Sequence, residues 1–103
     1  MDEHEVRALA NALNDPSENV RRAAGLNLFI AGPNAKYVVS ELVASLDHPD
    51  FFIRRASAAA LSNVGADAGV ALKKLEQLKD TSDEKLRAWV VHAISAILSQ
   101  PTV

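Results

Sequence analysis

Apolar residues recur along this chain at intervals of three and four positions, which is the period of an amphipathic α-helix. Val6, Leu9 and Leu13 form the first such face and predict a helix near residues 2–13. The remaining faces are Val20, Ala23, Ala24, Leu28 and Ala31; Val39, Leu42, Val43 and Leu46, near residues 35–46; Ile53, Ala56, Ser57, Ala60, Leu61 and Val64; Leu72, Leu75 and Leu78; and Leu86, Trp89, Val90, Ala93, Ile94 and Ile97. No strict two-residue alternation outlasts this period, so we expect an all-α protein of six helices.

Helix-start and helix-stop residues separate these apolar faces. Asp15, Pro16 and Glu18 predict the start of the second helix, with the aspartate as N-cap and the proline in the first turn. Gly32, which a proline follows, predicts its end, because glycine adopts left-handed geometry and proline cannot continue a helix. Thr81, with a glutamate three residues later, predicts a capping box before the last helix.

One short stretch occurs three times, as Val20-Arg21-Arg22, Ile53-Arg54-Arg55 and Leu86-Arg87-Ala88, with its first arginines 33 residues apart. A constant internal period in the range of roughly 20–50 residues indicates stacked supersecondary units. Each helix pair is too small to bury its own apolar face, so neighbouring pairs must bury it jointly. We therefore expect one domain over residues 1–103, built of three helix pairs at about 2–33, 34–66 and 67–100.

The pattern Leu-x-Asp/His-Pro, then Val/Ile/Leu-Arg, Ala-Ala and Leu-x-x-x-Gly resembles HEAT repeats, from about Val6 to Leu98. The short period is most similar to the subgroup named after phycobilisome lyases. This resemblance implies a right-handed α-solenoid of three helix pairs. The third unit departs from the pattern, since Ser82 replaces the proline, Trp89 the small alanine and Leu98 the glycine. The scaffold hosts many unrelated functions, so the resemblance alone says little about this one.

Composition narrows the classes of function. The net charge is −2, which argues against a nucleic-acid-binding array. The chain has no cysteine, which removes disulfides and thiolate metal sites and fits a reducing compartment, so we expect a cytoplasmic protein. The acidic opening Met1-Asp2-Glu3 is unlike a signal peptide, and no apolar run is long enough to span a bilayer. Neither a nucleic acid nor a membrane is an expected partner.

No constellation of residues points to catalysis. The serines lie in no Gly-x-Ser-x-Gly elbow, and the 4 glycines form no phosphate-binding loop. His4 and Glu5 resemble one of the several His-Glu motifs with which some HEAT-repeat hydroxylases bind two irons. The equivalent positions 33 and 66 residues on begin with Tyr37 and Val70, so the motif does not recur. We therefore expect a non-enzyme without metal or cofactor, in which His4 is a surface residue.

The repeated arginines allow two interpretations. Arg21, Arg54 and Arg87 form a column that would either grip an acidic partner or tie each repeat to the next. The family resemblance implies the structural role, in which each guanidinium group binds acids or carbonyls of the turns between helices. Arg22 and Arg55 lie one position further round, where we expect them to face solvent.

We expect the second helices of the pairs to line the concave side of the solenoid. Small residues in the middle of that face, flanked by larger apolar ones, would form a shallow groove with arginines at one edge, suited to a helix or an extended peptide. Leu26 and Phe29 would either line this groove or pack against the first helix. Phe51 and Phe52 stand where the other units have polar residues, so we expect a contact hot spot with one ring buried and one partly exposed. The predicted partner-binding residues are Arg22, Leu26, Phe29, Phe51, Phe52, Arg55 and His92.

The last helix presents an apolar arc too broad for one neighbour, formed by Leu86, Trp89, Val90, Val91, Ile94 and Ile97. We therefore expect self-association or further repeats at the C-terminal end. These features together predict a protein-binding adaptor or scaffold whose concave face takes a protein or peptide ligand. The alternative, which the family name alone suggests, is an accessory subunit of a lyase-like factor that handles a tetrapyrrole-bearing protein.

Overall fold

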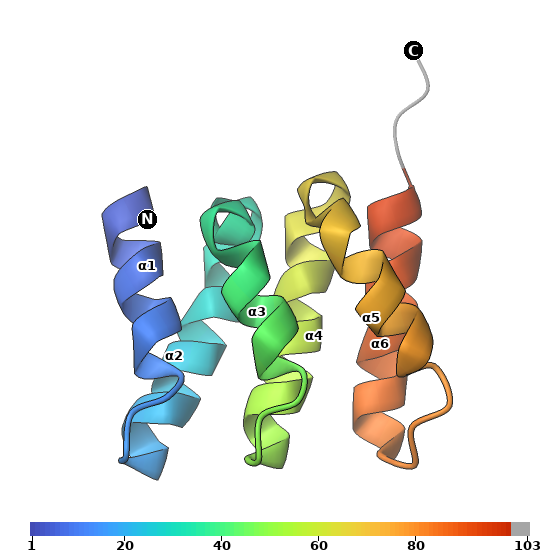
Figure 1. The fold of residues 1–103 in the computed structure, drawn as a ribbon. Helices are drawn as coiled ribbons and strands as arrows, with labels where there is room; N and C mark the ends of the chain where they lie inside the picture. The colour runs from blue at the N-terminus through green and yellow to red at the C-terminus, as the bar shows by residue number, and fades with distance from the viewer. Residues whose placement is uncertain (100–103) are drawn as a thin grey trace.

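The structure consists of helices arranged in pairs. The computed structural model describes residues 1–99 (Figure 1). The first pair is α1 (Glu3–Ala12) and α2 (Glu18–Ala31), the second is α3 (Val39–Ser45) and α4 (Phe51–Val64), and the third is α5 (Leu72–Gln77) and α6 (Glu84–Leu98). Two 3-10 segments, η1 (Gly32–Val38) and η2 (Gly65–Ala71), join one pair to the next. The described residues contain no strand, so the predicted all-α solenoid of helix pairs is confirmed.

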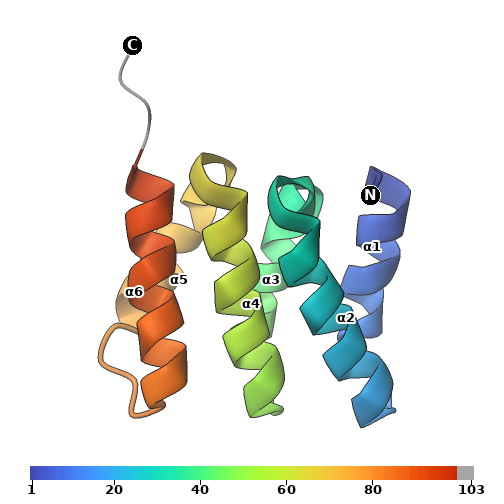
Figure 2. The same cartoon turned by 180° about the vertical axis from the view of Figure 1, so that it is seen from behind.

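The helices form two layers. α1, α3 and α5 lie side by side in one layer, and α2, α4 and α6 lie side by side in the other (Figures 1 and 2). The molecule measures 41 × 34 × 17 Å along its principal axes, so the stack is wide and thin. α4 packs against both α2 and α6 and forms the middle of the second-helix layer.

Each second helix starts at a capping side chain in the same position of the repeat. Ser17 caps α2, and Asp50 and Asp83, each 33 residues further on, cap α4 and α6. The predicted caps Asp15 and Thr81 are wrong. Both stand two residues before the true cap, and each accepts a hydrogen bond from the amide of the capping residue. These hydrogen bonds stabilise the turn before each second helix, and the helix itself begins only after the capping residue.

The segment predicted as the third helix begins as a 3-10 turn, and a matching 3-10 turn precedes the fifth helix. Gly32 and Gly65 stop the preceding helices with φ of +60° and +72°, in the left-handed region where glycine avoids strain. η1 then runs to Val38, whose φ of −127° and ψ of 27° are not helical. Ala68 interrupts η2 in the same way, with φ of −96° and ψ of 20°. α3 therefore begins at Val39, later than the predicted residue 35.

The apolar faces meet in one core, whose largest fully buried side chains include Leu13, Leu28, Leu42, Leu46, Ile53, Leu61, Leu75, Leu86 and Ile97. The predicted face of α2 is the exception, because Ala23 is exposed and Val20 is 44 % exposed. The equivalent residues Ile53 and Leu86 are 0 % and 2 % exposed. The second helix of the preceding pair covers these two residues, and within residues 1–99 no second helix precedes α2.

The exposed apolar arc on the last helix is narrower than the sequence suggested. α4, α5 and η2 all pack against α6 and cover most of it. Leu86, Val90 and Ile97 are buried in the core. Trp89 and Ile94 are partly buried against it. Only Val91 of the predicted arc is exposed, to 55 %.

The first arginine of each repeated stretch binds the turn that precedes its own helix. Arg54 Nη1 donates to the carbonyl oxygens of His48 and Pro49 at 2.9 and 3.2 Å. Arg21 and Arg87 make the equivalent contacts in the first and third repeats. These bonds lie within one repeat and hold the turn against the second helix. The predicted ties from one repeat to the next are made mainly by other residues.

Arg54→Ala should lower the free energy of unfolding by about 1–3 kcal/mol, because the substitution leaves two turn carbonyls without their donor. Arg7→Ala is the control. Arg7 pairs with Glu3 in an exposed contact on α1, so we expect a change within about 0.5 kcal/mol. Urea melts followed by circular dichroism measure both variants. Small and equal effects would contradict the role assigned to Arg54.

Candidate functional site

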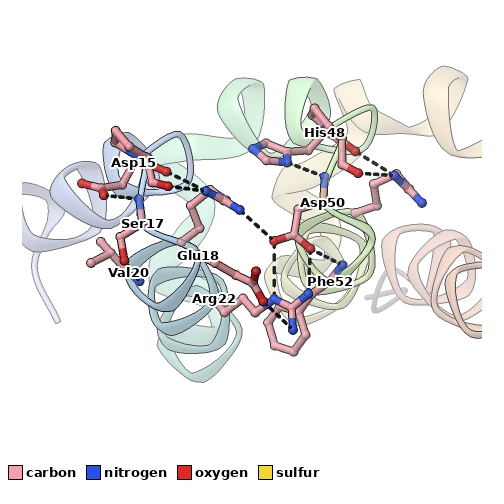
Figure 3. Close-up of polar contacts among 12 residues, drawn as sticks. Asp15, Ser17, Glu18, Val20, Arg22, His48, Asp50 and Phe52 are labelled. Carbon is pink, nitrogen blue, oxygen red and sulfur yellow. Dashed lines mark hydrogen bonds and ion pairs between the residues drawn. The ribbon is translucent and has the colours of Figure 1, made fainter.

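Arginine–aspartate pairs join the start of each second helix to the next. Arg22 Nη2 lies 3.2 Å from Asp50 Oδ1 (Figure 3). Arg55 Nε donates to both carboxylate oxygens of Asp83 at 3.1 Å. In each pair the arginine belongs to one repeat and the aspartate caps the second helix of the following repeat. Arg22 and Arg55, which the sequence placed toward solvent, therefore make most of the ties that were predicted for the neighbouring arginine column. Of that column, Arg21 also reaches the next repeat, with its Nη2 3.5 Å from Asp50 Oδ2.

The two aspartates are mostly shielded from solvent. The side chains of Asp50 and Asp83 are 7 % and 14 % exposed. Burial alone would raise the pKa of Asp50, but the hydrogen bonds from Arg22 and the Phe52 amide, with the nearby arginine charges, hold that pKa below its ordinary value. The pKa of Asp83 is lowered in the same way, against its burial, chiefly by Arg55. Both carboxylates are therefore held in their charged form.

The same two arginines also lie against the phenylalanine pair. The Arg55 guanidinium is 4.6 Å from the centre of the Phe51 ring, and the Arg22 guanidinium is 5.2 Å from it. Arg22 is also 5.1 Å from the Phe52 ring. These distances are in the range of cation–π attraction. Phe51 is 45 % exposed and Phe52 is half-buried against the core, so neither ring is fully buried.

A groove lies across the three second helices, with a volume of about 420 Å³. α4 contributes the small residues Ala56 and Ala59 at its centre. Arg55 and Lys85 supply its cationic groups. The groove, called the concave groove below, is lined by Leu26, Phe29, Phe52, Arg55, Ala56, Ala59, Lys85, Ala88 and Trp89. It combines an apolar surface with two cations and contains no acidic side chain.

A ring contact between the first and third repeats shows that this face curves inward. The rings of Phe29 on α2 and Trp89 on α6 meet edge to face, with centroids 5.6 Å apart and an interplanar angle of 70°. α4 lies between these two helices (Figure 2), and its small residues Ala56 and Ala59 line the same groove as the two rings. The second-helix layer is therefore the concave side. Phe29 lines the groove, where the sequence had left packing against the first helix as an alternative.

The structure brings together some, but not all, of the predicted partner-binding residues. Leu26, which is 52 % exposed, lines the concave groove with Phe29, Phe52 and Arg55. Arg22 and Phe51 line a separate, more polar cavity between the turns of the first two repeats. His92 stands beside the groove, with its ring 5.7 Å from that of Trp89. The predicted set therefore divides into a groove and an adjoining turn-side cavity.

Trp89 and Lys85 are groove residues that the sequence did not predict, and several small residues lie elsewhere than predicted. Trp89 was assigned to the core, although a large residue in a column of alanines was a usable signal. Among the small residues expected in the middle of the concave face, Gly25, Ala58 and Ser62 are buried. A Cβ atom on Gly25 would come within 3.1 Å of the Ala56 Cβ, so this position faces the next second helix at close range.

Other candidate chemistry finds no support in the described part of the chain. His4 is exposed on α1. Among residues 1–99 no three histidine, cysteine, aspartate or glutamate side chains gather in a way that could hold a metal ion. None of the described helices has the length and apolar character needed to cross a membrane.

Acidification should weaken the arginine–aspartate pairs. The folded chain holds the Asp50 proton less tightly than the unfolded chain does, so the stabilisation is present at neutral pH and is lost as pH falls below about 4. We expect Asp50→Asn, which can still cap α4, to have a lower free energy of unfolding at pH 7 and to lose less of it at pH 3 than the wild type. Urea melts at both pH values measure this, with Glu3→Gln as the control for an exposed ion pair. The prediction would be contradicted if the free energy of unfolding of Asp50→Asn fell between pH 7 and pH 3 by as much as that of the wild type.

Comparison with known proteins agrees with this architecture. A family model described as HEAT repeats matches residues 6–95, which run from α1 into α6. No curated protein matches the chain at a significant level. HEAT repeats are generally scaffolds for protein interactions. Since the match spans most of the chain and all three helix pairs, this protein belongs to the HEAT repeat family.

Proposed function

We propose that this chain is a non-catalytic protein-binding adaptor whose concave groove takes a peptide segment of a partner protein. The observation that carries the proposal is the groove itself, in which an apolar surface remains open to solvent between three helices. Leu26 is 52 % exposed there and lies beside aromatic rings. An exposed leucine and partly exposed rings gain little for folding, whereas such residues are typical of binding hot spots.

The charges of the groove indicate the character of the ligand. Arg55 is already paired with Asp83, and within residues 1–99 Lys85 makes no ion pair. A ligand that placed a carboxylate near Lys85 would therefore gain a charge contact without breaking an existing one. The proposed ligand is a helix or extended peptide that inserts an apolar side chain beside Leu26 and carries acidic residues next to it.

Trp89 makes the proposal directly testable, because it is the single tryptophan of the chain and lines the groove. Peptides selected on the immobilised protein from a random phage library would be titrated against Trp89 fluorescence. We expect acidic peptides with an apolar anchor to be enriched and to change the emission. Leu26→Asp should weaken their binding more than about tenfold, because it places a charge on the apolar contact.

Val70→Asp is the matched control for this measurement. Val70 is 75 % exposed and lies in η2, outside the concave groove. This variant should bind the selected peptides as the wild type does. Peptides that bind Leu26→Asp as tightly as Val70→Asp would place the binding surface elsewhere.

The alternative function, in which the chain serves a lyase-like factor that handles a tetrapyrrole-bearing protein, makes a different prediction. A bilin bound beside Trp89 would shift its own visible absorption and quench the tryptophan emission. Titration of the protein with a free bilin separates this alternative from the adaptor proposal. A bilin response without peptide enrichment would favour the alternative.

A further inference from the structure

The interface between successive second helices occurs twice within the chain, with the same two halves. The earlier helix presents Gly25 in α2, whose position faces Ile53 and Ala56 of α4. Thirty-three residues on, Ala58 of α4 occupies the position of Gly25 and is fully buried. The later helix of this second interface presents Leu86, which is 2 % exposed. Each interface therefore joins the forward face of one second helix to the backward face of the next.

Within residues 1–99, no other element covers either half of this interface at the two ends of the stack. The backward face of α2, called the α2 end face, consists of Val20, Ala23, Asn27 and Ile30, in the columns of Ile53, Ala56, Ala60 and Asn63. The forward face of α6, called the α6 end face, consists of Ala88, Val91 and Ser95, in the columns of Arg55, Ala58 and Ser62. Val20, Ile30 and Val91 are 44 %, 64 % and 55 % exposed.

The residues that form the arginine–aspartate pairs inside the chain are replaced at both of these faces. Ser17 stands in the column of Asp50 and Asp83, and Ala88 stands in the column of Arg22 and Arg55. If the α6 end face met an α2 end face in the register seen inside the chain, Ala88 would lie opposite Ser17. Neither a buried arginine nor a buried aspartate would be left without its partner, which is the costly outcome at such an interface.

Side-chain size is also compatible with this contact. Inside the chain, a glycine faces isoleucine and alanine at the first interface, and an alanine faces leucine and tryptophan in the corresponding columns of the second. In the same register, Val91 would face Val20 and Ala23. The forward face would present a larger side chain than it does inside the chain, and the backward face would present smaller ones. The smaller side chains of one face therefore leave room for the larger side chain of the other.

We propose that copies of this chain stack head to tail, with the α6 end face of one copy on the α2 end face of a second copy. The contact continues the 33-residue period from one copy into the next. It is heterologous and does not close on itself, so it extends into linear arrays as concentration rises. α1 and α5 carry exposed charged side chains, among them Glu5 and Lys73, so we expect the contact to be weaker than an obligate interface. This proposal does not depend on the concave groove.

Sedimentation velocity over a concentration series up to the millimolar range tests the proposal with three exposed valines. Val20→Glu blocks the α2 end face, and Val91→Glu blocks the α6 end face. Val70→Glu is the matched control, because Val70 is 75 % exposed but lies in η2, outside both faces. We expect the wild type and Val70→Glu to associate alike. Each blocked variant should raise the dissociation constant more than about tenfold.

A mixture of the two blocked variants is the decisive measurement. Each variant keeps one intact end face, so the equimolar mixture should form a complex of two chains and nothing larger. Circular dichroism melts check that both variants fold. The proposal is overturned by a wild type that stays monomeric throughout the series, by a blocked variant that self-associates like the wild type, or by a mixture that stays monomeric.

Discussion

Two carboxylates determine how the repeats of this protein are spaced. Asp50 and Asp83 each accept a hydrogen bond from an amide in the first turn of their own helix. Each also forms an ion pair with an arginine of the preceding repeat. Helix capping fixes the carboxylate relative to its helix. The ion pair therefore fixes the preceding helix relative to the same point. Arg55 and Phe51, at the edge of the concave face, take their positions from this arrangement.

The features that sequence analysis predicted correctly are those that depend on local chemistry. Helix period follows from the spacing of Val6, Leu9 and Leu13, and helix ends follow from Gly32 and Gly65, because a glycine in a left-handed conformation stops a helix within one turn. The three-fold recurrence of one stretch then predicts the stacking of pairs. For Phe29 the sequence left two positions open, the concave face and packing against the first helix, and its side chain lines the concave groove.

The features that sequence analysis missed depend on contacts between repeats. Val20 and Ile53 are both followed by two arginines and an alanine, yet one is exposed and the other is covered by α2. Arg22 is drawn away from solvent by a carboxylate 28 residues further along the chain. Trp89 lies in the column of Ala23, which is exposed, and Ala56, which is half-buried, and its place in the groove is marked by its ring contact with Phe29 of α2. A repeat pattern in the sequence predicts the structure of each helix pair better than it predicts the contacts between pairs.

The contact between Phe29 and Trp89 changes how the stack can move. Most interactions in a solenoid join nearest neighbours, so its stability is approximately a sum over units and their interfaces. These two rings join units that are not neighbours, since α4 lies between α2 and α6. Opening the curve of the stack must separate them, and so must any ligand that enters between them. The curvature of the stack and the occupancy of the groove therefore both depend on the separation of these two rings. A molecule that pulled on either end of the stack would alter the binding site in the middle.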